Sequence, residues 1–284
     1  MTWPIVLIVL CAALLHATWN ALIKSGADKA SDTALLTIAS ALVALPALVW
    51  LGLPDRHVWP FVLTSMLIHL GYYSALVEAY RHGDLGLTYP IMRGFAPLLV
   101  ALGSSAFIGE APSAAAWFGI VGIALGVATV GLARPGEALH HRRALGFAFS
   151  NAVLIAFYTT VDGLGVRAGG GALRYVLLLF VLNGVPYPAL VWLRRNPAER
   201  SALIDHARRR WRVALAGGAA SMGAYAIALW AMTRAPVASV AALRETSVLF
   251  AALIGTRLLK EHFGLQRALG TLVIAAGVMA LRFG

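Results

Sequence analysis

The chain has 284 residues, of which 60% are hydrophobic and only 12% are charged, and its formal net charge is +11. Soluble domains are nearer half apolar and a quarter charged, so this composition excludes an ordinary soluble protein. The apolar residues come in blocks of about twenty, the length that crosses a bilayer core of roughly 30 Å as a helix. The sequence therefore predicts an all-α integral membrane protein whose backbone satisfies its own hydrogen bonds within the lipid.

Ten apolar blocks predict ten transmembrane helices. In chain order they cover about residues 4–23, 34–53, 59–80, 85–107, 113–133, 145–165, 173–193, 213–233, 237–256 and 265–282. The first block lacks the basic start of a signal peptide and nine more blocks follow it, so we expect it to be a membrane span. The single cysteine, Cys11, lies in this block, which excludes an intrachain disulfide and a thiolate metal cluster.

The loops divide the basic residues unequally. Ten spans put both termini on one side, where the loops hold five Lys and Arg residues, against sixteen on the other side, including Arg208–Arg210. Because cytoplasmic loops collect Lys and Arg, we expect the termini outside the cell's inner (plasma) membrane and the basic loops in the cytoplasm. The run Arg208–Arg210 suits contact with anionic lipid, and we expect no nucleic-acid partner.

A repeat relates the two halves of the chain. The hexapeptide PALVWL occurs at Pro46–Leu51 and again at Pro188–Leu193, 142 positions later. The same shift pairs His16 with Tyr158 and Asn20 with Asp162; the shift then becomes 152, pairing Tyr73 with Tyr225, and settles at 151, pairing Arg93 with Arg244 and Glu110 with Glu261. Since each half holds five spans, an odd number, equivalent helices run in opposite directions. Such inverted halves can rock around a central site, which is how secondary transporters alternate access.

We accordingly expect a first five-helix repeat over residues 1–133, a cytoplasmic basic linker over 134–144, and a second five-helix repeat over 145–284. The strings APLLVALGSSAFIGEAPSAAAWFGIVGIALGVATVGL and TSVLFAALIGTRLLKEHFGLQRALGTLVIAAGVMAL each resemble the second half of an EamA repeat. Each has a helix that ends in Gly-Glu or Lys-Glu, a short turn and a Gly-rich helix. The whole chain is similar to the ten-helix EamA-type members of the drug/metabolite transporter superfamily.

This resemblance implies a transporter of small metabolites, because relatives handle amino acids, nucleotide-sugars, sugar phosphates and other metabolites. It implies that helices 5 and 10 support the fold, while the other eight surround the cavity and helices 4 and 9 line it. Consistent with a supporting role, Gly119, Gly122 and Gly126 in span 5 allow close contact with span 10 or with a neighbouring molecule, and packing within the chain is favoured.

Two arginines lie inside spans. Arg93 and Arg244 occupy matching depths of spans 4 and 9, where a buried charge is costly unless it is paired or solvated. Two guanidiniums that face one cavity would bind a carboxylate or phosphate. The alternative is a structural ion pair, in which Glu245 neutralises one arginine and Glu78 or Asp162 the other.

Prolines suggest where the spans deform. Pro90 and Pro97 flank Arg93, so we expect span 4 to be broken or kinked there, whereas span 9 has no internal proline. Pro46 is expected to bend span 2, and Pro186 with Pro188 to bend span 7 more strongly.

Three carboxylates and a histidine are candidates for proton coupling. Glu245, Glu78 and Asp162 could each bind a proton or a substrate ammonium, and His69 could relay protons near neutral pH. Glu78 lies three residues from Arg81 and could simply pair with it, and Asp162 lies near a span end and could be interfacial.

Polar and aromatic residues complete the candidate substrate site. These residues are His16, Trp19, Asn20, Tyr73, Tyr89, Tyr158 and Trp230, with Tyr225 as a further aromatic wall. His16 and Asn20, four apart, share one helix face. The alternative is that such groups only hydrogen-bond between helices and hold the bundle together.

The sequence carries no H-E-x-x-H, G-x-S-x-G or G-x-x-x-x-G-K-[ST] signature, so we expect no enzyme activity, no metal and no cofactor. We expect a secondary active or exchange transporter for an organic anion or an amino-acid-like zwitterion. Its partners would be this small molecule, the lipid bilayer and protons, with the chain acting as a monomer or homodimer. The alternatives are an exporter of cationic drugs or toxic compounds, and a non-transporting membrane sensor or assembly protein built on a transporter bundle.

Overall fold

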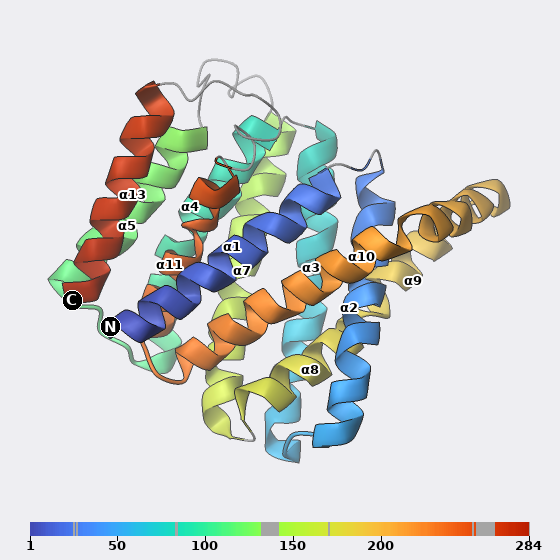
Figure 1. The fold of residues 1–284 in the computed structure, drawn as a ribbon, viewed down its shortest axis with the longest axis horizontal. Coiled ribbons are helices and arrows are strands. Elements are labelled where there is room, and N and C mark those ends of the chain that lie inside the picture. Colours follow the sequence, from blue (N-terminus) through green and yellow to red (C-terminus); the bar gives the residue numbers. More distant parts are fainter. Residues whose placement is uncertain are drawn as a thin grey trace.

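The computed structural model describes residues 1–24, 26, 28–82, 85–131, 142–169, 171–251, 253 and 265–283, and every element in these ranges is helical (Figure 1). The elements are α1 (Trp3–Lys24), α2 (Lys29–Leu51), η1 (Arg56–Val58), α3 (Trp59–His82), α4 (Leu85–Gly103), η2 (Ser104–Ile108), α5 (Ala114–Gly131), α7 (Arg142–Ala168), α8 (Ala172–Asn183), α9 (Pro186–Leu193), α10 (Pro197–Met232), α11 (Val237–Arg244) and α13 (Leu265–Phe283). The predicted all-α class is confirmed.

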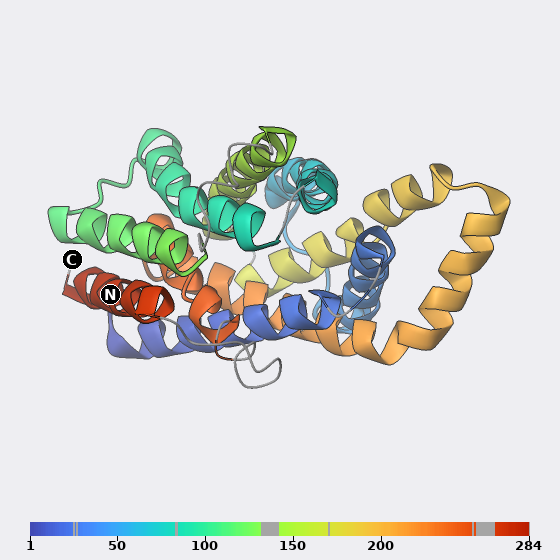
Figure 2. The same cartoon turned by 90° about the horizontal axis from the view of Figure 1, so that it is seen from above.

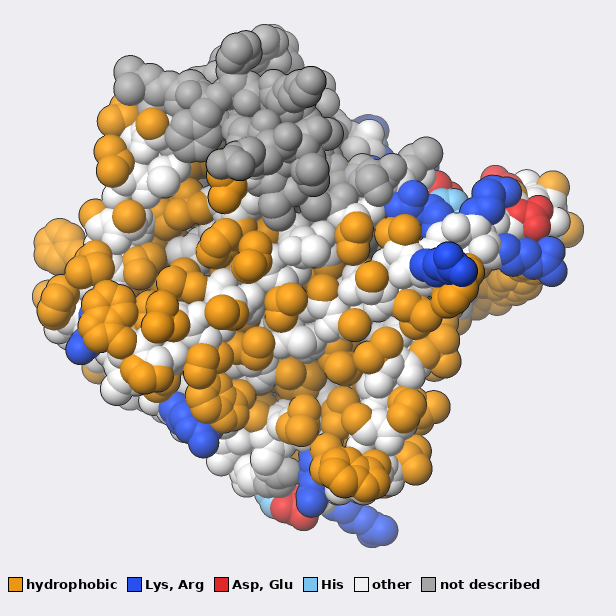
Figure 3. Space-filling model, in the orientation of Figure 1, with side chains coloured by type: hydrophobic (Ala, Val, Ile, Leu, Met, Phe, Trp, Pro, Cys, Tyr) orange, Lys and Arg blue, Asp and Glu red, His pale blue; other side chains and the backbone are white. Residues whose placement is uncertain are grey.

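Within the described residues, seven helices are long and apolar enough to cross a membrane, and two shorter apolar helices cover Ala114–Val130 and Ala268–Phe283. Large hydrophobic side chains such as Trp50, Phe118 and Leu193 point outward, and hydrophobic groups cover much of the face shown in Figure 3. An outer surface of this kind is solvated by lipid tails, as predicted from the composition.

The structure corrects the predicted start of span 8. The sequence predicts a basic loop over 194–212 before that span, whereas α10 is one continuous helix of 36 residues that begins at Pro197. The cause is a capping box: the Asn196 side chain accepts a hydrogen bond from the Glu199 amide, and the Glu199 carboxylate accepts one from the Asn196 amide. Five arginines of this segment therefore lie on the first half of a helix that projects from the bundle, while Arg194 and Arg195 precede it (Figure 2).

The predicted deformation of span 7 is confirmed, since the helix is interrupted between Asn183 and Pro186. Of the predicted break or kink at Arg93, the break is wrong, because α4 continues through Arg93 and Pro97 to Gly103, and the kink stays a prediction. The interruption occurs instead in span 9, where α11 ends at Arg244 and a turn intervenes before the helix resumes at Ser247. A proline removes one helical hydrogen bond, and the packing of α5 and α7 along α4 holds that helix together nonetheless.

The helices pack in groups that mix the two repeats. Helices α1 and α10 lie side by side, and α2 and α8 pack on the same group, while α3 and α4 pack on α7 (Figures 1 and 2). The contact between α2 and α10 is so close that a Cβ at Gly218 would lie 2.7 Å from the Ser40 amide nitrogen. The two sequence halves are therefore packed into each other and do not form two separate bodies.

Helices α5 and α13 form a pair at one side of the molecule (Figure 2). Their glycines meet directly: a Cβ at Gly126 would lie 2.9 Å from the Gly270 carbonyl oxygen, and one at Gly119 would lie 2.8 Å from that of Gly277. Glycine at these positions lets the two backbones touch, so the expected close packing of spans 5 and 10 within the chain is confirmed.

Candidate functional site

The buried charges meet where α4 passes the interruption of span 9. The Nε atom of Arg93 lies 2.6 Å from Oε2 of Glu245, and each residue is only 4% exposed. Arg93 comes from the first repeat and Glu245 from the second. Of the ion pairs considered from the sequence, this is the one that the structure forms at Arg93.

Arg244 precedes Glu245 directly, and consecutive side chains point in different directions, so Arg244 contacts a different residue. Its guanidinium carbon lies 5.0 Å from the centre of the Tyr225 ring of α10, within the range of a cation–π contact. Tyr158 of α7 and His16 of α1 each lie within electrostatic range of both Arg93 and Arg244. The two predicted arginines therefore belong to one buried region.

Asp162 of α7 lies in the same region and is fully buried. The Tyr175 hydroxyl of α8 donates to its Oδ1 at 2.7 Å, and the Tyr225 hydroxyl of α10 donates to its Oδ2. Asp162 is thus enclosed by the helices of the bundle. Tyr225 contacts both Asp162 and Arg244, so this side chain links the buried carboxylate to the buried guanidinium.

An aromatic cluster joins these charged groups. The His69 ring of α3 stacks on Tyr158 with 4.1 Å between ring centres, and the Tyr72, Tyr73 and Tyr225 rings lie within 6.2 Å of it. His69 Nδ1 lies 2.8 Å from the Ser65 carbonyl oxygen, one turn earlier on α3. His69 and Tyr73 share α3, and the structure brings the predicted Tyr158 of α7 against them.

The predicted α1 group is a local network. Trp19 Nε1 donates to His16 Nδ1 at 3.3 Å, and the Asn20 side chain donates to the His16 carbonyl oxygen at 2.8 Å. The Trp19 bond orients the His16 ring, which lies within electrostatic range of both buried arginines.

Two further candidates have their described contacts elsewhere. Glu78 pairs with Arg81 at 2.9 Å on a partly exposed turn at the end of α3, as the sequence allowed. The Trp230 ring lies against Arg234, with 4.4 Å from the guanidinium carbon to the ring centre. The side chain of the remaining candidate, Tyr89, lies outside the described residues.

Tyr175 is the buried partner that the sequence did not signal. It lies at the start of the mainly apolar helix α8. A carboxylate without a predicted partner, Asp162, was the available clue, because buried carboxylates require hydrogen-bond donors.

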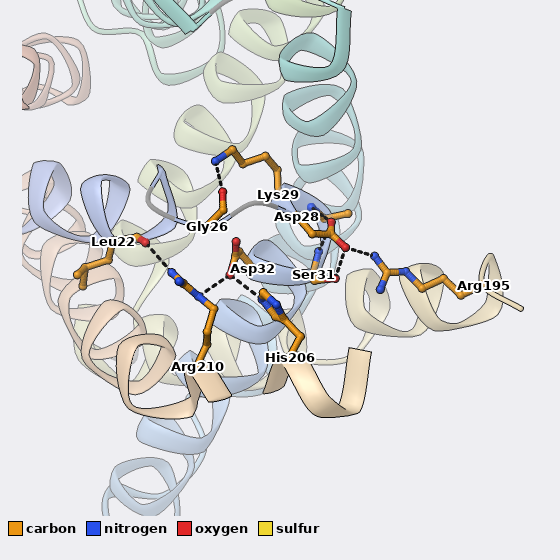
Figure 4. Close-up of polar contacts among 10 residues, drawn as sticks. Leu22, Gly26, Asp28, Lys29, Ser31, Asp32, Arg195, His206 and Arg210 are labelled. Carbon is orange, nitrogen blue, oxygen red and sulfur yellow. Dashed lines mark hydrogen bonds and ion pairs between the residues drawn. The ribbon is translucent and has the colours of Figure 1, made fainter. Parts of the chain in front are cut away.

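A second polar cluster, also unpredicted, surrounds Asp32 at the face where α10 begins (Figure 4). Asp32 Oδ1 lies 2.8 Å from His206 Nε2 and 3.0 Å from Arg210 Nε, and Arg210 also donates to the Leu22 carbonyl oxygen at 3.1 Å. The basic start of α10 is thereby fixed to the ends of α1 and α2.

Asp28, which precedes α2, belongs to the same face (Figure 4). Burial alone would raise the pKa of its carboxyl, but hydrogen bonds from Ser31 and from Arg195, whose Nη2 lies 2.6 Å away, together lower that pKa below its ordinary value. Within the described residues, neither face nor interior holds a group of three or more His, Cys, Asp or Glu side chains that could bind a metal ion.

A bundle of membrane-crossing helices, inverted in two repeats around buried arginines and carboxylates, defines a polytopic membrane protein with a charged interior. Residues 3–132 and 142–283 each match the EamA-like transporter family, and the chain belongs to that family. A crystal structure of another protein has the same fold, with a TM-score of 0.77 and 21% sequence identity over 100% of this chain and 98% of that one. Among curated proteins, none matches the chain.

Proposed function

We propose that the protein is a secondary active or exchange transporter that moves a small polar metabolite across the inner membrane by alternating access. The observation that carries the proposal is the burial of Arg93, Arg244 and Glu245 in one region between the two repeats. A charge inside a membrane bundle is costly, so such groups are kept where they bind a substrate or an ion.

Arg244 is the group best suited to recognise an anion. A guanidinium that stacks on an aromatic ring uses its flat face, and its N–H groups lie in the guanidinium plane and can form a fork with a carboxylate or phosphate. The Arg244 guanidinium carbon lies over the Tyr225 ring, 5.0 Å from its centre. It therefore supports a substrate with at least one anionic group.

The charges of the region nearly balance, with Arg93 and Arg244 against Glu245 and Asp162. A lone anion would upset this balance, whereas an amino-acid-like zwitterion would bring both charges, its carboxylate to Arg244 and its ammonium to Glu245. An organic anion that enters with a proton would keep the balance equally well. Both forms remain within the proposal.

Asp162 is the best placed of the four proton-coupling candidates. Its two oxygens accept bonds from hydroxyls on α8 and α10, so protonation would change the contacts between α7 and both helices. His69 lies near Tyr225 and Glu245 near Arg93, and both can take part. Glu78, paired with Arg81 at a helix end, has the weakest case.

A second candidate function is export of an organic cation. The tyrosines and His69 around Asp162 form an aromatic, anionic environment of the kind that holds cationic groups. A non-transporting sensor could use either site.

We propose that the arginine-rich face, which includes the start of α10, lies in the cytoplasm and both termini outside.

A thermal-shift screen of purified protein against amino acids, carboxylates, sugar phosphates, phosphonates and cationic drugs tests the substrate class. Stabilisation by anions or zwitterions that disappears in Arg244→Ala supports the proposal. Stabilisation by cations alone, unchanged in that variant, favours the export function. Counterflow in liposomes then separates a carrier from a sensor, because a sensor binds the ligand without exchanging it.

A further inference from the structure

The face that holds both chain termini is here called the terminal face; there the Met1 amino group lies 3.5 Å from the Arg282 carbonyl oxygen. An ion pair between Glu110 and Arg167 lies at this face. Glu110 follows η2 at the end of span 4, and Arg167 lies in the last turn of α7. Arg167 Nη2 lies 2.6 Å from Glu110 Oε1, and the two side chains are 31% and 15% exposed, respectively.

Both members of this pair also bind the backbone between α10 and α11. Arg167 donates from Nε to the Met232 carbonyl oxygen at 2.9 Å and from Nη2 to that of Ala235 at 3.0 Å. The Val237 amide donates to both Glu110 oxygens, at 3.1 and 2.9 Å. Two side chains thus join the ends of spans 4, 6 and 8 to the start of span 9.

The same contacts lead directly to the candidate substrate site. Val237 is the first residue of α11 and Arg244 is the last, so about 10 Å of buried helix separates the Glu110 contact from the substrate arginine. A carboxylate at a helix N-terminus is favoured by the helix dipole. Glu110 therefore holds one end of the helix whose other end carries Arg244.

The surrounding packing makes this junction tight. A Cβ at Gly163 of α7 would lie 2.8 Å from Val237 Cγ2, and His57 Nε2 lies 2.8 Å from the Ala168 carbonyl oxygen. These contacts lie beside those that Glu110 and Arg167 make with the α10–α11 backbone.

The sequence repeats only one of the two members of this ion pair. The repeat pairs Glu110 with Glu261, but the shift of 142 positions pairs Arg167 with Ser25. The inverted repeat therefore does not supply a second arginine for an equivalent pair at the opposite face.

We propose that Glu110 and Arg167 are positioning residues that form the gate of the terminal face, and that they set the position of Arg244 through α11. The gate opens when the pair releases the α10–α11 backbone. A ligand that binds Arg244 shifts α11 and thereby favours either the closed or the open gate. This inference rests on the proposed transport function, which it extends by naming the element that controls access.

The test measures how fast a buried thiol is modified. Ser239, the third residue of α11, is 4% exposed, and Ser239→Cys changes only one atom of its side chain. Cys11, the one native cysteine, is replaced by serine. A water-soluble maleimide is added to the protein in lipid nanodiscs, without substrate, and the modification rate is compared in Glu110→Gln and Arg167→Gln.

We expect both substitutions to raise the rate by about tenfold or more, which corresponds to a shift of about 1.4 kcal/mol toward the open gate. Asp205→Asn and Arg208→Gln serve as matched controls, because they make the same changes in an exposed pair of α10 and should leave the rate unchanged. A second reporter, Ser40→Cys, is buried between α2 and α10 and reveals general loosening.

Equal acceleration at Ser239→Cys and Ser40→Cys would mean that the pair only stabilises the fold and would overturn the gate. A rate within about twofold of the parent would overturn it as well. If the Gln variants fail to fold, Arg167→Lys decides alone, since it keeps the charge but loses the fork that binds two carbonyls. The reporter needs no substrate, so failed counterflow with a confirmed gate would refute the transport proposal separately.

Discussion

Arg93 and Glu245 come from opposite repeats, yet their Nε and Oε2 atoms lie 2.6 Å apart with both side chains buried. An ion pair removed from water gains little net stability, because desolvating the two charges offsets much of their attraction. Removing one member is costly, however, since the other charge stays buried without its partner. A ligand that offers its own charges can therefore replace the pair at little cost. Truncating one of the two side chains, in contrast, should lower the stability of the protein.

The first prediction concerns stability. Glu245→Ala should lower the free energy of unfolding by about 3–5 kcal/mol, because it leaves the Arg93 charge in the interior. Unfolding in mild detergent, followed by circular dichroism, measures this loss. The double variant Arg93→Met with Glu245→Leu should recover most of it, and a double variant less stable than Glu245→Ala would contradict this account.

The second prediction separates recognition from folding at Arg244. Arg244→Ala should abolish counterflow of the substrate identified in the screen, and the melting temperature without ligand measures how much of this loss comes from folding. Arg244→Lys should not restore transport, because lysine keeps the charge but neither stacks on Tyr225 as a plane nor forms a fork. Full activity in Arg244→Lys would show that only the charge matters there.

The third prediction concerns coupling. Asp162→Asn should keep exchange of substrate between two compartments but lose uptake driven by a pH gradient, because the amide cannot take up and release the proton. Liposome assays with and without the gradient measure both activities. Tyr175→Phe is the matched control, since it removes one hydrogen bond to the carboxylate and leaves the carboxylate in place. Gradient-driven uptake at the wild-type rate in Asp162→Asn would exclude the residue as the coupling group.

The fourth prediction follows from Asp28, which lies outside the membrane spans. Its pKa is lower in the folded protein than the ordinary value of 3.8, so the folded state favours the ionised form. The stability that Asp28 contributes is therefore fully present above pH 3.8 and is lost as the pH falls below that value through the lower folded pKa. Thermal unfolding of the wild type and Asp28→Asn should differ by a constant amount at higher pH and converge in acid; a difference that grows in acid would reverse the sign.

Much of the fold was predictable because lipid leaves the backbone few choices. Apolar blocks of sufficient length must form helices, and the PALVWL repeat with five spans per half requires inversion. The helical start of α10 was not predictable from hydropathy, since its first turns are basic. A capping box at Asn196 and Glu199 was the local signal for it.

The site was predictable in its members but not in its pairings. Arg93, Arg244, Glu245 and Asp162 stand out because charges are rare inside spans. Their partners depend on how helices rotate about their axes, and hydropathy carries no information about that rotation. The sequence therefore left open which arginine Glu245 would meet, and it did not connect Asp162 with Tyr175.

Residues Asp32 and Arg210 bind across helices that the ribosome makes at different times. At about 5–20 residues per second, α1 and α2 enter the bilayer on the order of ten seconds before α10 is complete. During that interval the Asp32 carboxylate and the small-residue surface around Ser40 lack the partners that α10 supplies. The first repeat cannot reach its final packing when its own synthesis ends, and it waits in the membrane for a helix of the second repeat.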